Sequence, residues 1–262
     1  MCRLLKISRN TYYYVKAGKR CDGQLENEII RIFRNSRNCY GTRKIKKEIK
    51  DRRVSRRYIA RVMRKYNLIS KYTQKHFKYS AKGVNEEKVP NVVNREFNNR
   101  GRLEVVVSDL TYVRVGEGWN YVCLILDLHN REIIGKACGR RKDASLVEQA
   151  FLSIHQPLDQ ITIFHTDRGS EFKNVCIDKL VKAFGIQRSL SKKGCPYDNA
   201  VAEATYNIFK TEFVFGSKFH SLVQLERELD AYVLWYNNVR IHGALGYTSP
   251  VAYRQSANSS VR

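Results

Sequence analysis

Three acidic residues, Asp109, Asp167 and Glu203, are the side chains of this chain best suited to metal-dependent chemistry. Asp109 closes the run RLEVVVSD and Asp167 closes ITIFHTD, and both runs are rich in residues typical of strands. We expect Asp109 to end the first strand and Asp167 the fourth, with Glu203 about one turn into a helix entered through KKGCPYDNA. If the two strands are neighbours, their aspartates converge and the helix adds the glutamate.

A cluster of three carboxylates needs a cation, because like charges at one spot repel strongly. Two divalent ions with oxygen ligands remove that repulsion, and Mg²⁺ is the usual ion beside phosphates. Two such ions, roughly 3.5–4 Å apart, can activate an attacking oxygen and stabilise the leaving oxygen of an in-line phosphoryl displacement. The three acids together therefore predict phosphoryl-transfer chemistry.

Each acid taken alone has an ordinary structural explanation. Asp109 is then a turn residue at a strand end, Asp167 the first residue of an Asp-Arg-Gly turn, and Glu203 an exposed residue of a helix. The prediction of a catalytic site depends on the three occurring in one chain.

The segments around the acids predict a mixed, helix-covered sheet of five strands. Three strand-like runs come first, then a helix, a strand, a helix, a short strand and two more helices, an order that gives an α/β fold. The predicted strands are 102–115, 119–130, 131–140, 161–167 and 186–191, and the predicted helices are 142–156, 170–185, 198–215 and 221–240.

Positive charge is concentrated at the start of the chain. The 262 residues carry a net charge of +23, and residues 1–82 alone hold 25 Lys and Arg against 5 Asp and Glu. The remaining residues are close to neutral, with 23 basic and 20 acidic side chains. Such a balance predicts a polyanionic partner, with nucleic acid ahead of an anionic membrane.

Three helices are expected within residues 24–66. The third begins after Ser55, a suitable N-cap, and has two distinct faces. Apolar residues recur on one face, and Arg57, Arg61 and Arg64 recur at helical spacing on another, with Arg56 beside them. These four arginines fit a recognition-type helix that contacts DNA, although a solvated basic face without a target has the same pattern.

The chain divides into five predicted parts. Residues 1–20 form a partial helix-turn-helix arm, which is either a DNA contact or a plain amphipathic arm, and residues 21–79 form an all-helical, helix-turn-helix-type DNA-binding domain. A polar linker is expected over 80–101 because it holds Pro90 and several Asn and Gly residues. The sheet and its C-terminal helices follow over 102–254, and a tail over 255–262.

Several other classes of protein do not fit the sequence. No apolar stretch is as long as a membrane span, and the start MCRLLKISRN has no apolar core of a signal peptide. The seven cysteines form no C-x-x-C pair, which argues against a zinc site. We expect a cytoplasmic protein and no membrane partner.

Three sequence blocks resemble a known family. SDLTYV, HTDRGSEF and PYDNAVAEATYNIFKTEF are similar to the signature blocks of transposases and integrases with an Asp, Asp, Glu triad, and 35 residues separate Asp167 from Glu203. YNNVRIHGALGYTSPVAYR resembles the closing block of the same family. The similarity is strongest to the IS-three group of bacterial insertion sequences, and it covers about residues 24–254.

This resemblance implies a ribonuclease-H-like core in which Asp109, Asp167 and Glu203 bind two Mg²⁺ ions, with Mn²⁺ as an alternative ion. It implies nicking at the ends of an insertion sequence and then attack of the freed 3′-hydroxyl on another phosphodiester. Double-stranded DNA and a homo-oligomer on that DNA are the implied partners. Because these proteins are often made by frameshifting, we also expect an upstream-frame protein as a partner.

The resemblance also implies DNA contacts within the core region. The family often has a basic residue seven positions after the glutamate, which is Lys210 in this chain. Glu203, Asn207 and Lys210 share one helical face, so Asn207 and Lys210 are predicted to reach DNA near the metals, while a plain surface lysine is the alternative. Tyr236, Arg240 and His242 either contact DNA or cap the core.

Two other functions remain open on the sequence alone. One is a metal-dependent nuclease of the same fold that does not join strands. The other is a DNA-binding regulator whose acids have no catalytic role, although the intact triad argues against it. Strand joining distinguishes a transposase from the nuclease.

Overall fold

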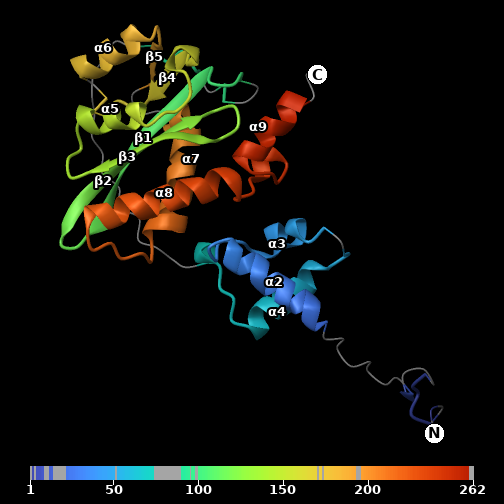
Figure 1. The fold of residues 1–262 in the computed structure, drawn as a ribbon. Helices are drawn as coiled ribbons and strands as arrows, with labels where there is room; N and C mark the ends of the chain where they lie inside the picture. Colours follow the sequence, from blue (N-terminus) through green and yellow to red (C-terminus); the bar gives the residue numbers. More distant parts are fainter. Residues whose placement is uncertain are drawn as a thin grey trace.

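A computed structural model gives the conformation of most of the chain (Figure 1). The described residues are 2, 4–8, 12–13, 22–50, 52–73, 90–94, 96–97, 100–169, 171–172, 174–192 and 196–259. Most of the predicted arm over 1–20 and the first part of the predicted linker lie outside these residues. The rest forms a small helical region followed by a larger sheet-containing core.

A single mixed sheet organises the core. Its strands are β1 (Val105–Val115), β2 (Gly118–Asp127), β3 (Ile133–Gly139), β4 (Ile163–Thr166) and β5 (Gln187–Leu190). They lie in the order β3-β2-β1-β4-β5. The first three pair as antiparallel hairpins, whereas β4 pairs with β1 and β5 pairs with β4 in parallel. The predicted mixed five-stranded sheet is confirmed, and this is the ribonuclease-H-like arrangement.

Helices cover both faces of the sheet (Figure 1). On one face, α5 (Ala144–Leu152) and α6 (Val175–Ala183) pack on the sheet, and α7 (Ala200–Phe209) and α8 (Leu222–Asn238) pack on the other. Val105 and Val107 belong to the core under α7 and α8, while Val106 belongs to the core under α5. A strand buried on both faces has no polar side to expose, which explains the unbroken Val-Val-Val run.

The N-terminal helices form a separate small core. They are α2 (Gly23–Asn35), α3 (Thr42–Glu48) and α4 (Arg56–Lys65), as the sequence predicted to within a few residues. Ser55 does cap α4, since its hydroxyl accepts a hydrogen bond from the backbone N–H of Tyr58 at 3.1 Å. Ile29, Ile45 and Ile59 are fully buried at the centre of this cluster.

The helical region is docked against α8 of the core. The indole N–H of Trp235 donates to the carbonyl of Asn35 at the end of α2 (3.0 Å), and the Arg37 guanidinium lies 5.8 Å from the Trp235 ring centre. Ile241, which follows α8, belongs to the apolar cluster of the N-terminal helices and donates its N–H to the Tyr40 hydroxyl at 2.8 Å. The two regions therefore share apolar and polar contacts.

The predicted linker and tail differ from the structure. Within the linker, Val93 is fully buried in the core under α7 and α8, and the N–H of Val92 donates to the Ser189 hydroxyl at 2.9 Å. Val93 occupies a core position and Val92 packs beside it, so the second half of the predicted linker packs on the sheet domain. The tail begins within α9 (Pro250–Ser259), a helix that an Arg254–Glu132 ion pair joins to the core.

None of the helices in the described part of the chain is both long and apolar enough to cross a membrane.

Gly135 in β3 allows α5 to approach the sheet closely. A Cβ at this position would lie 2.6 Å from the carbonyl oxygen of Ala150 and 2.9 Å from Cγ1 of Ile154. We expect Gly135→Ala to lower the free energy of unfolding by about 1–3 kcal/mol, because the overpacked helix must move. Chemical denaturation measures the change. Gly118→Ala in β2 is the control, since its Cβ would lie 3.8 Å from the nearest atom, and an equal effect of both changes would contradict the explanation.

Candidate active site

Asp109 and Asp167 lie at the same level of two neighbouring parallel strands. β1 and β4 pair with Val105 opposite Ile163 and Val107 opposite His165. Continuing this register by two residues sets Asp109 level with Asp167, just past the end of β4 at Thr166. Parallel neighbours in register bring side chains of equal parity to the same face of the sheet, so the two carboxylates converge as predicted.

The expectation that Asp109 ends its strand is wrong. β1 continues to Val115, and Asp109 lies opposite Leu124 within the β1–β2 hairpin. What ends at this level is β4, so the edge of β1 beyond Asp109 has no β4 neighbour. Asp109 thus pairs within the long β1–β2 hairpin on one side, while on the other side β4 does not extend beyond it.

Tyr206 fixes α7 against this part of β1. Its hydroxyl donates to the backbone carbonyl of Asp109 and accepts from the N–H of Leu124 at 2.6 Å. The side chain is almost completely buried. Because Glu203 lies one helical turn before Tyr206, the same contacts fix the position of Glu203 along the sheet relative to the two aspartates.

The three carboxylates influence one another electrostatically. Burial and the charge of Asp167 raise the pKa of Asp109 to about 7, against an ordinary value of 3.8. Burial raises the pKa of Asp167, and partial burial together with the charge of Asp167 raises the pKa of Glu203. Mutual repulsion of this kind is what a bound cation relieves.

The donor set fits a hard divalent ion. Carboxylate oxygens are the ligands that Mg²⁺ prefers, and Asp109 and Asp167 present two of them at one level of the sheet. Within the described residues, no three His, Cys, Asp or Glu side chains are grouped closely enough to qualify as a metal site. Asp109 and Asp167 could hold an ion together, with Glu203 reaching it from α7.

The sequence analysis did not single out Glu171 and Lys142, which lie beside the acids. Glu171 is buried, and its carboxylate pairs with the Lys142 ammonium at 3.0 Å. It also packs onto Gly169, where a Cβ would lie 2.4 Å from Oε1 of Glu171. The loop after β4 therefore folds back on itself, and the Asp167 carboxylate accepts the N–H of Gly169 at 2.9 Å. The motif HTDRGSEF contained Glu171, but only the fold reveals Lys142 as its partner.

Lys210 lies between the acids and an exposed aromatic pair. Its charge lowers the pKa of Asp109, and its ammonium lies 5.8 Å from the ring centre of Tyr112. Tyr112 contacts Trp119 edge to face, with ring centres 5.1 Å apart, and the Arg114 guanidinium lies 5.4 Å from the Trp119 ring centre. The alternation of aromatic and basic residues in YVRVGEGW was a signal for this surface that the sequence analysis missed. Asn207 is exposed on α7, three residues before Lys210.

The predicted arginines of α4 lie on the surface of the helical region. Arg56, Arg57 and Arg64 are exposed, and Arg61 is half-buried with its guanidinium 4.7 Å from the Tyr58 ring centre. A surface hollow runs along this face and is lined by Ser55, Arg57, Tyr58, Arg61, Arg64 and Lys65. The geometry leaves these arginines available to an anionic partner.

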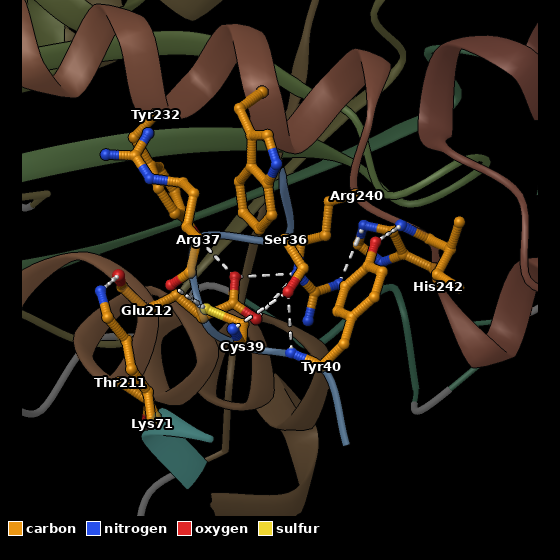
Figure 2. A network of polar contacts seen from close by, with 12 residues as sticks. Ser36, Arg37, Cys39, Tyr40, Lys71, Thr211, Glu212, Tyr232, Arg240 and His242 are labelled. Carbon is orange, nitrogen blue, oxygen red and sulfur yellow. Dashed lines mark hydrogen bonds and ion pairs between the residues drawn. The ribbon is translucent and has the colours of Figure 1, made fainter. Parts of the chain in front are cut away.

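Tyr236, Arg240 and His242, for which DNA contact and capping of the core were both left open, lie inside the molecule. All three side chains are buried, with exposed fractions of 7% or less. The Arg240 guanidinium forms a 2.8 Å ion pair with Glu212 and donates to the ring of His242 at 3.1 Å (Figure 2). Capping the core, one of the two roles left open, fits these contacts, because the charge of Arg240 is paired with Glu212.

Comparison with known proteins identifies the family. Residues 99–196 and 203–257 each match an integrase core domain, and residues 20–76 match an HTH-like domain. A protein named insertion element IS600 uncharacterized 31 kDa protein, from Shigella sonnei, is 31% identical, and the match covers 97% of both chains. The transposase for insertion sequence element IS904 from Lactococcus lactis is 30% identical over 87% of this chain and 94% of its own. The chain belongs to the insertion-sequence transposases of the IS-three type.

The transposase is thus a member of a family of polynucleotidyl transferases with an integrase core, and the resemblance inferred from its motifs is confirmed. The chain spans about half the length of one relative, the probable transposase of element IS1353 from Shigella flexneri, which is 32% identical over 96% of this chain and 51% of its own. Among solved structures, the HTLV-2 integrase catalytic core domain in complex with magnesium is similar with a TM-score of 0.43 and 12% identity. The match covers 64% of this chain and 99% of that one.

The raised pKa of Asp109 gives the transposase a testable pH dependence. A carboxylate with a folded-state pKa near 7 and an ordinary value of 3.8 binds its proton more tightly in the folded state. Its charge therefore reduces stability progressively as the pH rises from about 4 to about 7. In EDTA, we expect Asp109→Asn to increase the free energy of unfolding more at pH 8 than at pH 5, by about 1–2 kcal/mol.

Denaturant titrations at the two pH values measure this difference. Asp159→Asn, which changes an exposed aspartate, is the control and should shift stability equally at both. A stabilisation by Asp109→Asn that does not grow with pH would show that Asp109 is not under electrostatic stress.

Proposed function

We propose that this transposase nicks DNA at the ends of its insertion sequence and then joins the freed 3′-hydroxyl to a second phosphodiester, using Asp109, Asp167 and Glu203 as its catalytic carboxylates. The alignment of Asp109 with Asp167 across the parallel β1–β4 pair carries this proposal. The hydrogen bond from Tyr206 to the Asp109 carbonyl supports the assignment of Glu203, because it ties α7 to the same point of the sheet.

When bound by the carboxylates, two divalent ions would supply activation of the attacking oxygen and stabilisation of the leaving oxygen. Mg²⁺ is the expected ion, with Mn²⁺ as an alternative. The residues of the chain would hold and orient these ions. Asp109 and Asp167 would provide ligands from the sheet, and Glu203 would provide one from α7. Lys210 would hold a phosphate next to Asp109, because its positive charge acts on that carboxylate.

The DNA is expected to contact both parts of the chain. The exposed arginines of α4 would bind the phosphates of the insertion-sequence end, and Asn207 with Lys210 would bind the strand being cut. Tyr112 and Trp119 would flank that strand, since exposed aromatic rings among cations stack on bases. We further propose that the transposase acts as a homo-oligomer on double-stranded DNA in the bacterial cytoplasm, at the nucleoid.

Asp167→Asn tests the catalytic assignment. It removes a charged ligand while keeping the shape of the side chain, so we expect loss of Mg²⁺-dependent nicking and joining by at least about a thousandfold with little change in DNA affinity. Labelled duplexes carrying the ends of the element report nicked and joined products. Asp159→Asn again serves as the control. Unchanged cleavage by Asp167→Asn would exclude this site, whereas wild-type nicking without joined products would favour a nuclease of the same fold.

Removing the arginine face of α4 tests the DNA-binding assignment. We expect the triple change of Arg57, Arg61 and Arg64 to Ala to weaken DNA binding and to lower the salt slope of the affinity by about one for each lost phosphate contact. Fluorescence anisotropy at several salt concentrations measures both. The control is the triple change of Arg140, Arg141 and Lys179 to Ala in the sheet domain. An equal decrease of the salt slope in this control would show that the effect follows from net charge and not from contacts of α4 with DNA.

A further inference from the structure

Glu212 is a buried carboxylate on the same helical stretch as Glu203. α7 ends at Phe209 and passes directly into a π-helix, Lys210–Val214, which turns Glu212 into the interior. Only 1% of Glu212 is exposed. π-helical turns are rare and are frequently found at functional sites, so the contacts that hold this turn are of interest.

Three different segments provide those contacts (Figure 2). The Arg240 guanidinium, after α8, donates to both carboxylate oxygens at 2.8 and 2.9 Å, and the Tyr232 hydroxyl of α8 donates at 3.1 Å. From the N-terminal helical region, the Tyr72 hydroxyl donates to Oε1, and the Lys71 ammonium donates to the backbone carbonyl of Glu212 at 2.7 Å.

The network is closed with respect to charge. A buried ion pair is tolerated when further hydrogen bonds satisfy its remaining atoms, and both Glu212 oxygens accept more than one donor. Burial and the nearby charge of Arg240 lower the pKa of His242 to about 2, so its neutral ring can accept from Arg240. Loss of Arg240 or Glu212 would therefore leave the other as a buried charge without its partner.

Two anchors fix the helical stretch that bears Glu203. At one end, Tyr206 bonds the Asp109 carbonyl; at the other, Glu212 is gripped by Arg240 and by Tyr72. Between them the chain stays helical, since α7 continues directly into the π-helix, so a shift of the Glu212 anchor is passed to the helix that carries Glu203. Lys71 and Tyr72 belong to the 3-10 helix η1 (Lys71–Thr73), which five residues separate from the arginine-bearing α4.

We propose that Glu212 is a positioning residue through which the N-terminal DNA-binding region sets the place of Glu203. Tyr72 and Lys71 hold Glu212, and Glu212 holds the helix. The role rests on the proposed function, since it assumes that Glu203 is catalytic. In this arrangement the region that binds the insertion-sequence end is mechanically joined to a carboxylate that acts on it.

Tyr72→Phe is the sharpest test, because it removes one hydroxyl from a ring that is 46% exposed and leaves the buried ion pair intact. We expect faster hydrogen exchange in peptides covering residues 203–214. We also expect about a tenfold lower kcat for nicking, with an unchanged KM for DNA, since a small displacement of a catalytic group is costly.

Tyr66→Phe is the matched control. Tyr66 is 40% exposed, and its hydroxyl donates to Glu26 at 2.7 Å entirely within the helical region. If the two variants exchange alike over residues 203–214, the anchor is refuted. If exchange increases in Tyr72→Phe but kcat does not fall, the link to Glu203 is refuted. Exchange is read without catalysis, so it tests the anchor even where the proposed function fails.

Discussion

The parallel pairing of β1 with β4 is the constraint on which the candidate site depends. Antiparallel hairpins join β1, β2 and β3 locally, but Asp109 meets Asp167 only because β4 returns beside β1 in the same direction and in a register that aligns the two acids. A shift of one residue would turn one of these side chains to the opposite face. The buried valines on both faces of β1 resist such a shift, since each would have to leave its own core.

The same constraint brings an electrostatic cost. Aligning two aspartates below a helix with a third acid concentrates negative charge. Burial is the main cause of the raised pKa values of the three acids, and the charge of Asp167 adds to it at Asp109 and Glu203. The charge of Glu171 adds to this cost at Asp109 and Asp167 even though Glu171 pairs with Lys142, whereas the charge of Lys210 lowers the pKa of Asp109. The core is close to neutral in total charge, so its site is built from local arrangement, whereas the N-terminal region relies on accumulated positive charge.

Much of this arrangement could be predicted from the sequence, but its long-range pairings could not. The β-branched runs gave the strands, and Ser55 gave the start of α4, because both depend on neighbours in the chain. Asp109 was wrongly predicted to end its strand because β1 extends beyond the end of its partner β4. The residues of β1 do not indicate where a partner strand ends. The role of Arg240 was left open between DNA contact and capping because its partner, Glu212, lies 28 residues away in the sequence.

The burial of Arg240 shows that the molecule does not use all of its positive charges on its surface. A lone arginine in a basic DNA-binding protein is expected to face phosphate, yet Arg240 is 3% exposed and joined to a carboxylate. An apolar pair of the same size could fill this space at lower desolvation cost, so the ion pair is better explained by geometry than by stability. Its hydrogen bonds have fixed directions, and they specify how η1, α8 and the end of α7 meet. Apolar contacts alone would tolerate sliding at this junction, and sliding there would move Glu203 relative to the aspartates.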